Sequence, residues 1–319
     1  MPHPITLTPA DIFTPQALWD AYLCARRGKR DRWHVMDFDL SAAARLSDLH
    51  TAILDGSYRP QPCRVFTIYC HCGHKNRIIR APAFADLIVQ FALYRALYPL
   101  ISPSLIADSY GCRPGLGTHR AADRVQRFMR RHGTHCLQMD IRRYYYSVRH
   151  AILRRQLSRW VQDARVLDLL MMCAGDEDPG VGVGSLMAQF FGMIYLNDLD
   201  QYCKRRLGIR QYVRYVDDIV IIDTSDHLHQ WLGEISTFLC ERLDLSLSRY
   251  SIRPLRDGID FCGYIARREC RRVRPAARTR FRQLLREGRW QGLQSCAAHA
   301  LHTASMERYQ RALDKRLGR

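Results

Sequence analysis

Residues 215–222 read Tyr-Val-Asp-Asp-Ile-Val-Ile-Ile, so that two adjacent aspartates, Asp217 and Asp218, stand between two apolar runs. Runs this rich in β-branched residues predict short strands, at about 211–216 and 219–222, with both acids at a tight hairpin turn. Buried neighbours would fix this turn while the carboxylates face outward and repel one another unless a cation binds. Oxygen ligands suit Mg²⁺, and paired metal ions can clamp the attacking and leaving oxygens of a phosphoryl transfer.

A third acid can be grouped with these two. Asp140 ends a short apolar run, residues 135–140, that also predicts a strand. Aspartate is common in ordinary turns, so the pair by itself favours a simple turn between strands. A carboxylate at the end of a second strand, together with the apolar flanks, favours a metal site instead. We therefore predict that Asp140, Asp217 and Asp218 are the catalytic carboxylates.

The rest of the chain alternates helical patterns with a few strands. A helix is predicted to begin at Pro15, after an N-cap at Thr14, and to end at Gly28. Further helices are predicted at about 41–56, 85–100, 118–131, 150–160, 164–173, 186–202 and 226–242, and strands at 64–69, 77–81 and within 258–265. The remainder reads as helical. This pattern is typical of an α+β fold in which a small sheet carries the acids and helices lie behind it.

The chain is strongly basic. Its 319 residues include 49 Lys and Arg against 31 Asp and Glu, which gives a formal net charge of +18. A GC-rich genome could explain the preference for arginine over lysine, but not the excess of positive charge. Such a chain attracts nucleic acid, because binding phosphates releases condensed counterions. Between Tyr264 and Trp290 ten arginines stand against two acids, which on helices suits a grip on an RNA–DNA duplex.

Other features bear on location and on metals. No apolar run approaches the roughly 20 residues that span a bilayer, and residues 1–10 lack a signal-peptide pattern, so we expect a soluble cytoplasmic protein with no membrane partner. The twelve cysteines are scattered, as in a reduced intracellular chain. Cys63, Cys70, Cys72 and His74 could form a tetrahedral zinc site, but a plain hairpin tip explains the same cluster. The sequence leaves both interpretations open.

Five motifs, in order along the chain, resemble those of the reverse transcriptase family. Residues 215–218 resemble the Tyr-x-Asp-Asp hairpin of the family's palm, and residues 140–148, Asp-Ile-Arg-Arg-Tyr-Tyr-Tyr-Ser-Val, resemble its first catalytic strand. Residues 77–90 and 108–119 are similar to the fingers and upper palm of bacterial enzymes related to group II introns. Residues 258–264, Gly-Ile-Asp-Phe-Cys-Gly-Tyr, resemble the Phe-Leu-Gly-Tyr primer grip, with cysteine in place of leucine. The resemblance covers nearly the whole chain.

This resemblance implies a right-hand polymerase fold with fingers, palm and thumb. Residues 1–134 would form an N-terminal extension and the fingers with the upper palm. Residues 135–265 would form the palm, with a small antiparallel sheet and helices, and residues 266–319 a basic helical thumb. The activity would be RNA-directed DNA polymerisation with two Mg²⁺ ions, for which Mn²⁺ can substitute.

The resemblance also assigns roles to single residues. Asp140, Asp217 and Asp218 would hold the metal ions, assisted by the carbonyl of Ile141. Tyr145 stands where the family places a steric gate, an aromatic ring that would clash with a ribose 2′-hydroxyl and select deoxynucleotides. A simple packing role at the end of the strand is the alternative for this tyrosine.

The remaining assignments follow from the same motifs. The residues implied to bind the incoming nucleotide are Lys75, Arg77, Tyr145, Val183 and Gln189, with Arg80 as a further candidate. Those of the primer grip are Phe261, Gly263 and Tyr264. Those expected to bind nucleic acid are Arg113, Arg271, Arg272, Arg274, Arg278 and Arg282. Basic residues in a hairpin are often only solvated, so the fingers assignments depend on the resemblance.

One departure from the common pattern points to a subfamily. Most bacterial relatives carry Gln-Gly-x-x-x-Ser-Pro before the helix at the nucleotide, whereas residues 183–189 read Val-Gly-Ser-Leu-Met-Ala-Gln. This is similar to the form found in diversity-generating retroelements, with Ala188 where serine is usual. Residues 18–22 and 28–30 also resemble that subfamily. Such bacterial or phage-encoded enzymes copy a template-repeat RNA with errors at adenines, for mutagenic retrohoming into a target gene.

The expected partners are template RNA, the RNA–DNA duplex, dNTPs and, by resemblance, an oligomeric accessory variability determinant protein. Three rival interpretations stay open. The first is an ordinary bacterial reverse transcriptase, from a group II intron or an antiphage system. The second is a non-catalytic RNA-binding scaffold that keeps the fold, which the three carboxylates disfavour. The third is a metal-dependent nuclease, which Tyr145 at the gate position disfavours.

Overall fold

The computed structural model describes residues 4–70 and 75–317, except the side chains of Cys70, Lys75 and Leu317. The chain forms two compact units, each assembled from three separate stretches. The first contains Met1–Ile106, Arg143–Asp198 and Cys240–Leu245, and the second contains Ala107–Arg142, Leu199–Leu239 and Ser246–Arg319. The division predicted at 134/135 and 265/266 differs from this one and stays a prediction.

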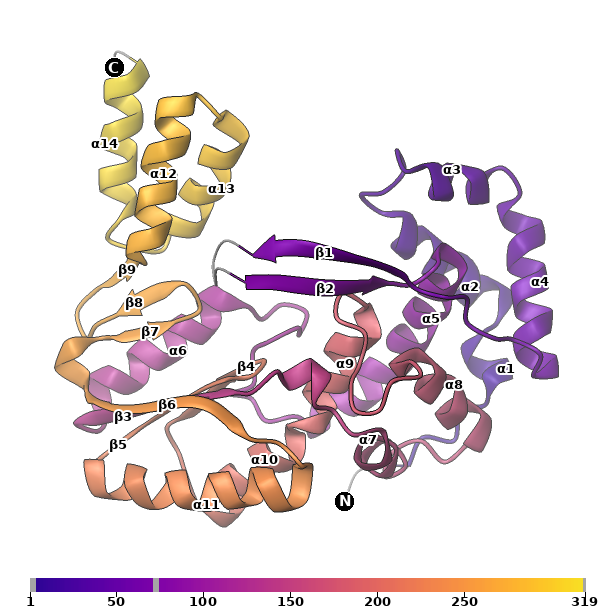
Figure 1. Cartoon of the computed structure of the whole chain (residues 1–319), viewed down its shortest axis with the longest axis horizontal. Coiled ribbons are helices and arrows are strands. Elements are labelled where there is room, and N and C mark those ends of the chain that lie inside the picture. The colour runs from indigo at the N-terminus through magenta and orange to yellow at the C-terminus, as the bar shows by residue number, and fades with distance from the viewer. Residues whose placement is uncertain (1–3, 71–74, 318–319) are drawn as a thin grey trace. The chain divides into compact units, whose positions relative to one another are not determined.

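The first unit is mainly helical (Figure 1). Its helices are α1 (Pro9–Ile12), α2 (Pro15–Arg26), α3 (Trp33–Asp39), α4 (Ala42–Asp55), α5 (Phe84–Ile101), α7 (His150–Leu157), α8 (Ala164–Ala174) and α9 (Leu186–Tyr195), with 3₁₀ turns η1 (Ser102–Ser104) and η2 (Tyr144–Tyr146). Strands β1 (Arg64–Cys70) and β2 (Lys75–Ala81) form an antiparallel hairpin. The Thr14 hydroxyl accepts the Ala17 N–H, which confirms the predicted cap of α2.

The second unit holds the main sheet. Its elements are α6 (Thr118–Arg131), β3 (His135–Ile141), the π-turn η3 (Tyr202–Arg206), β4 (Tyr212–Tyr215), β5 (Asp218–Asp223), β6 (Leu247–Pro254), the 3₁₀ turn η4 (Leu255–Asp257), β7 (Ile259–Phe261), β8 (Tyr264–Ala266), β9 (Arg271–Val273), α12 (Pro275–Glu287), α13 (Trp290–Ala300) and α14 (Met306–Leu317). Two helices, α10 (Asn197–Gln201) and α11 (Ser225–Leu243), continue across the border between the units. The strands form an antiparallel sheet of order β4-β5-β3-β6 and a smaller one of order β7-β8-β9.

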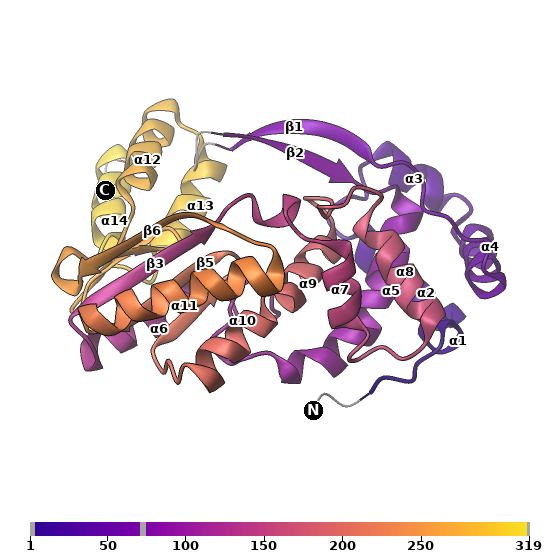
Figure 2. The ribbon, with the colours of Figure 1, turned by 60° about the horizontal axis from the view of Figure 1, so that its bottom comes forward.

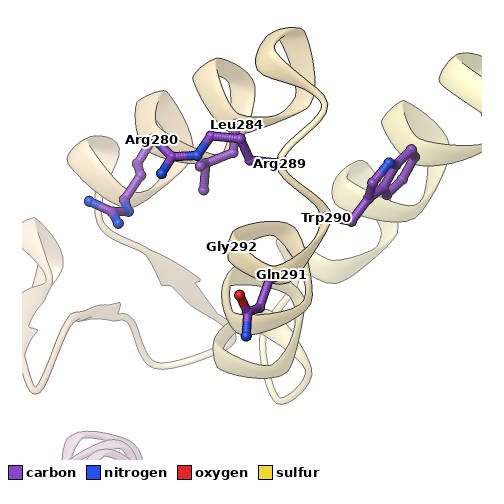
Figure 3. A pocket seen from close by; sticks show the side chains of 6 residues that line it. All are labelled: Arg280, Leu284, Arg289, Trp290, Gln291 and Gly292. Atoms are coloured by element: carbon purple, nitrogen blue, oxygen red, sulfur yellow. The ribbon is translucent and has the colours of Figure 1, made fainter.

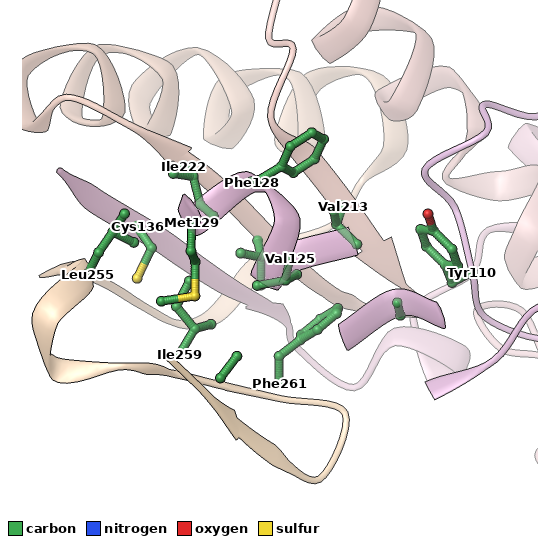
Figure 4. Packing of buried hydrophobic residues seen from close by; sticks show 13 residues of the cluster. Tyr110, Val125, Phe128, Met129, Cys136, Val213, Ile222, Leu255, Ile259 and Phe261 are labelled. Atoms are coloured by element: carbon green, nitrogen blue, oxygen red, sulfur yellow. The ribbon is translucent and has the colours of Figure 1, made fainter. Parts of the chain in front are cut away.

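Helix α6 and strand β7 cover one face of the main sheet. Val125, Phe128 and Met129 of α6 pack with Cys136 of β3 and Ile222 of β5, and further with Val213, Ile259 and Phe261 (Figure 4). Helix α11 runs along the other face of this sheet (Figure 2). Successive side chains of a strand point to opposite faces of the sheet. Because both faces are covered, the pairing register determines which residues of β3 and β5 point toward α6.

The α+β fold class is confirmed, and most predicted elements are present. Three predictions need correction. Strand β6 was not predicted, because its exposed outer residues leave no continuous apolar run. The helix predicted at 186–202 ends at Tyr195 and is followed by the short α10 and η3. The basic tail is not wholly helical, since Arg271 and Arg272 lie in β9.

One helical segment, Phe84–Ser104, is long and apolar enough by composition to cross a membrane, with a mean hydropathy of 1.3. The expectation that no segment approaches that length is therefore corrected. Polar residues such as Asp86 and Gln90 interrupt the apolar sequence of this helix, but the mean hydropathy of the whole window stays high in spite of them. Half of the segment is buried within the protein, and the core helix of a soluble protein passes the same test, so the finding is weak evidence for a membrane.

Candidate active site

The structure brings Asp140 and Asp218 face to face on neighbouring strands. They are direct partners in the antiparallel pairing of β3 with β5, and Asp217 precedes Asp218 in the turn from β4. By alternation, Asp140 shares a face with Cys136, and Asp218 shares one with Ile222. Both acids therefore lie on the α6 side of the sheet.

The electrostatics of this cluster favour a cation. Burial, followed by the negative charges of Asp217 and Asp140, raises the pKa of Asp218 to about 6. Arg249 and Arg274 act in the opposite direction but do not cancel the effect. A carboxylate with this much unneutralised negative charge gains most from a hard cation.

Strand β6 supplies the partners of Asp140. The Ser248 hydroxyl donates to Asp140 Oδ2 at 2.5 Å and lies 3.1 Å from the Asp140 carbonyl oxygen. Arg249 Nε lies 3.7 Å from the same carboxylate and is 79% exposed. Sequence reasoning missed both residues, because it did not predict the strand that carries them.

Among the described residues, no three His, Cys, Asp or Glu side chains converge as a ready-made metal-binding group. The donor chemistry nevertheless fits Mg²⁺, since two facing carboxylates and a third in the adjoining turn offer only hard oxygens. Burial and the charges of Asp217 and Asp140 both raise the pKa of Asp218, which is consistent with three carboxylates grouped at this end of the sheet. The zinc alternative concerns Cys63, which is exposed, and the Cys70 side chain, Cys72 and His74, which lie outside the described residues.

A buried ion pair holds the turn that carries Asp217 and Asp218. Arg214 and Asp200 are 1% and 0% exposed, and the guanidinium donates to both carboxylate oxygens, at 2.7 and 2.5 Å. Tyr212 donates its hydroxyl to the same carboxylate at 2.7 Å. A third guanidinium nitrogen donates to the carbonyl of Val216 at 2.9 Å. Val216 has a φ of +58°, a conformation disfavoured for a β-branched residue, so this contact supports a strained position.

The segment before α6 also contacts the turn that carries Asp217 and Asp218. Tyr110 N–H donates to the Arg214 carbonyl at 2.9 Å, and Arg214 N–H donates to the Asp108 carbonyl at 3.0 Å. A Cβ placed on Gly111 would lie 2.5 Å from the Val216 backbone nitrogen. Only glycine permits this approach. Sequence signals for the group existed: Arg214 is a charge in the middle of a strand-forming run, and Gly111 lies inside a family motif.

The predicted primer-grip residues stay a prediction. Phe261 and Tyr264 are 2% and 0% exposed and belong to apolar clusters, so their side chains anchor the β7–β8 hairpin. Cys262 and Gly263 form the turn, with φ values of +52° and +86°. Burial and the nearby Asp218 carboxylate raise the pKa of the Cys262 thiol, which places this turn beside the catalytic acids.

In the first unit, Tyr145 is half-buried in η2 against α9. Its carbonyl accepts the Val181 N–H at 2.8 Å. A Cβ on Gly192 of α9 would lie 3.0 Å from the Tyr145 ring and 3.3 Å from the Tyr144 ring. The missing side chain at Gly192 thus provides the space in which the predicted gate ring sits.

Of the predicted nucleotide-binding residues of the first unit, Val183 and Arg80 contact each other at the base of the hairpin. The Val183 carbonyl accepts the Arg80 N–H of β2 at 3.0 Å. Gly184 follows with φ +105°, and a Cβ there would lie 2.7 Å from Ile79. Gln189 and Arg77 are exposed, as binding residues require. Arg80 is ion-paired with Glu177, and the side chain of Lys75 lies outside the described residues.

The basic residues divide into structural and exposed groups. Arg271 is 6% exposed and pairs with Asp123 at 2.7 Å, so it has a structural role, and its assignment to nucleic-acid binding stays untested. Arg274 pairs with Asp260, and Arg113 donates to the Ser109 carbonyl at 2.9 Å. Arg272 and Arg282 are exposed, and Arg278 is half-buried, so these three keep the predicted role as an expectation.

A surface cavity of about 330 Å³ lies where α12 meets α13. It is lined by Arg280, Leu284, Arg289, Trp290, Gln291 and Gly292 (Figure 3). A Cβ on Gly292 would lie 3.0 Å from Leu284, so glycine lets the two helices approach. The cavity adds two arginines to the basic surface of the tail.

The pKa of Asp218 predicts a pH effect on stability. Because this pKa is raised from 3.8 to about 6, the folded state binds the proton more tightly than the unfolded chain between these values. The contribution of this group to stability is therefore present at low pH and is lost as the pH rises through about 6. Without divalent cations, we expect the urea midpoint to rise between pH 7 and pH 5 more in the unmodified protein than in Asp218→Asn. An equal change in the urea midpoint of both proteins would show that the pKa of the Asp218 carboxyl is not raised in the folded state.

A small antiparallel sheet with three carboxylates at one end, covered by helices, defines the palm of a template-directed nucleic-acid polymerase. Residues 73–265, more than half of the chain, match the family model of the reverse transcriptases (RNA-dependent DNA polymerases). The chain therefore belongs to the reverse transcriptase family and has its right-hand polymerase fold. It is an RNA-directed DNA polymerase by family.

Several known proteins are similar to this chain. Protein YkfC of Escherichia coli (strain K12) is 31% identical over 271 residues, covering 70% of this chain and 71% of that protein. The group II intron-encoded protein LtrA of Lactococcus lactis subsp. cremoris is 23% identical over 50% of this chain and only 28% of its own length. Telomerase from Candida albicans, solved with a fragment of telomeric RNA, has a TM-score of 0.49 at 13% identity, covering 69% of this chain and 47% of that one.

Proposed function

We propose that this chain is the error-prone, Mg²⁺-dependent reverse transcriptase of a diversity-generating retroelement. The observation that carries the subfamily is the segment from Val183 to Gln189, where an apolar residue replaces the usual glutamine. Its position supports a role in fidelity, because Val183 is bonded to β2 at the base of the fingers hairpin. The template would be a template-repeat RNA, and the product a cDNA with errors at adenines.

In this proposal Asp140, Asp217 and Asp218 hold two Mg²⁺ ions, with the carbonyl of Ile141 as a further ligand. The ions would supply Lewis-acid activation of the primer 3′-hydroxyl and stabilise the charge of the leaving pyrophosphate. Ser248 would orient the Asp140 carboxylate through its hydrogen bond. The ion pair of Arg214 with Asp200 would keep the turn, and with it Asp217 and Asp218, in a fixed position.

Tyr145 would act as the steric gate against ribonucleotides. Tyr145→Ala is expected to reduce the discrimination between dNTP and rNTP about tenfold or more, because the ring that meets the 2′-hydroxyl is removed. The measurement is single-nucleotide extension with each substrate. Tyr146→Ala removes the neighbouring ring, whose hydroxyl donates to the Ile78 carbonyl at 3.2 Å, and serves as the matched control. Equal changes in both variants would exclude the gate.

Val183 would lower fidelity because an apolar side chain cannot make the hydrogen bond of an amide near the nucleotide. Val183→Gln is expected to reduce misincorporation opposite template adenines about tenfold, with smaller changes opposite the other bases. Val183→Ile, which keeps the apolar character, should leave the errors as they are. An unchanged error spectrum in Val183→Gln would contradict this role and leave Val183 a packing residue.

The partners in this proposal are the template RNA, the RNA–DNA duplex, dNTPs and an accessory variability determinant oligomer. The exposed arginines of the tail, among them Arg272 and Arg282, support duplex binding. The second candidate is an ordinary bacterial reverse transcriptase, which the match to the intron-encoded LtrA favours equally.

Deep sequencing of cDNA separates the two candidates. Purified protein would copy a primed RNA of mixed sequence with Mg²⁺ and dNTPs. Errors concentrated at template adenines would support the retroelement function. Accurate cDNA would still show polymerase activity but would favour the ordinary reverse transcriptase. No cDNA, even after adding the cognate RNA and accessory protein, would favour a non-catalytic scaffold.

A further inference from the structure

Helix α3 has two apolar faces, and one of them packs within the first unit. Val35 and Phe38 on this face are 0% and 5% exposed. The Phe38 ring lies against the rings of Tyr22 in α2 and Phe84 in α5, at centroid distances of 5.7 and 5.1 Å. These contacts fix the orientation of α3 and turn its other face outward.

The outward face carries Trp33, Met36 and Leu40, which are 76%, 50% and 86% exposed. Leu40 continues the helical conformation, with φ −60° and ψ −28°. At 3.6 residues per turn the three side chains fall within an arc of about 60°, opposite Val35 and Phe38. We call this row the α3 stripe. A single exposed apolar residue is ordinary, but a contiguous row of three large ones is typical of an interaction surface.

The segment before the stripe is cationic. Residues 27–32 contain four cations, Arg27, Lys29, Arg30 and Arg32, against one acid, Asp31. The like charge of Arg32 adds to burial in lowering the pKa of Lys29, which shows that the cations of this segment lie close enough to repel one another.

Nearby acids are already engaged by other residues. Asp39 accepts the Tyr22 hydroxyl at 2.5 Å and is ion-paired with Arg26, and Asp37 accepts from Arg45 at 2.8 Å. Asp39 also attracts Arg30 and so neutralises part of this charge, but Arg27, Lys29 and Arg32 stand against Asp31 alone. The α3 stripe thus adjoins a surface with an excess of positive charge.

We propose that the α3 stripe is the docking surface for a partner protein that presents an apolar helix face bordered by carboxylates. The aliphatic side chains of Met36 and Leu40 favour a protein over RNA, which is bound through cations and stacked aromatic rings. The cationic border calls for negative charge opposite, and this disfavours a second copy of the chain, which would bring like-charged segments together. The inference goes beyond the proposed function, since none of these residues belongs to the polymerase site.

The test uses the full chain and a defined probe. The probe is a fluorescein-labelled helical peptide of about 20 residues with leucines along one face and glutamates beside them. Its binding is followed by fluorescence anisotropy at two salt concentrations. We expect the triple variant Trp33→Ser/Met36→Ser/Leu40→Ser to bind at least about tenfold more weakly, and binding to the unmodified chain to weaken with salt.

The matched control removes three exposed apolar residues elsewhere in the same unit, Val65→Ser/Ile68→Ser/Ile78→Ser on the β1–β2 hairpin, which are 54%, 43% and 48% exposed. This control should bind the peptide like the unmodified chain. Equal weakening in both triple variants, or no binding at about 100 µM peptide, would overturn the proposal.

Three further experiments test whether the α3 stripe binds something other than a partner protein. Sedimentation that shows a dimer lost only in the stripe variant would assign the surface to a second copy. Flotation with vesicles of phosphatidylglycerol and phosphatidylcholine, lost only in that variant, would assign it to a membrane. A selective loss of affinity for single-stranded RNA would assign it to RNA. Each result would overturn the protein-docking proposal, and cDNA synthesis on primed RNA, measured in parallel, reports separately on the polymerase function.

Discussion

Arg214→Ala is expected to lower the free energy of unfolding by about 3–5 kcal/mol, because it leaves the carboxylate of Asp200 buried and unpaired. Both side chains are at most 1% exposed, and the guanidinium makes both hydrogen bonds to Asp200 as well as the one to the Val216 carbonyl. The measurement is urea unfolding followed by circular dichroism, with the midpoint and slope compared between proteins.

Two controls separate the buried charge from a general loss of arginine. Arg214→Met/Asp200→Leu removes both charges and is expected to regain a large part of the lost stability, since no buried ion is then left alone. Arg311→Ala breaks an exposed pair with Glu307, separated by 4.0 Å, and should cost at most about 0.5 kcal/mol. A change below about 1 kcal/mol in Arg214→Ala would contradict the role of the pair.

Asp217→Asn/Asp218→Asn is expected to reduce primer extension about 10³-fold or more while the fold is kept. The two carboxylates sit at the turn between β4 and β5, where burial and the neighbouring carboxylates raise the pKa of Asp218, so neutral amides at both positions relieve repulsion there while the ligands of the metal ions are lost. Extension of a labelled primer on RNA is the readout, with urea unfolding as the check on folding.

Asp226→Asn on α11 provides the matched control, because it removes an exposed carboxylate of the same unit outside the cluster. This variant should extend primers at nearly the rate of the unmodified chain. Residual activity above a tenth in the double variant would show that primer extension does not depend on these two carboxylates.

The sequence was informative where a local pattern and a local structure coincide. Asp217 and Asp218 fall at a hairpin turn because the β-branched runs on both sides form β4 and β5, and both could be read from eight residues. The pairing of Asp140 with Asp218 is non-local, and it was reached only because an acid ended a second apolar run. The cap of α2 at Thr14 followed from the same local reasoning.

What the sequence did not reveal depends on burial. Arg271 and Tyr264 look like binding residues in a basic tail, yet both are buried, because β8 and β9 form a small sheet under the helices that follow. Ser248 and Arg249 reach Asp140 only through β6, whose outer residues are too exposed to give an apolar pattern. The role of Arg214 was not predicted, because its partner Asp200 lies in a different element and no local sequence pattern connects the two residues.

Polymerisation on RNA by the unmodified chain is the most direct measurement. A labelled DNA primer annealed to an RNA of mixed sequence would be incubated with purified protein, dNTPs and a titration of Mg²⁺, beside the Asp217→Asn/Asp218→Asn variant. We expect cDNA that lengthens with Mg²⁺, is absent without a divalent cation and is absent in the variant. Primer that stays unextended at every Mg²⁺ concentration, even with the cognate RNA and accessory protein supplied, or cDNA that the variant makes equally well, would contradict the assignment of these carboxylates as the centre of a reverse transcriptase.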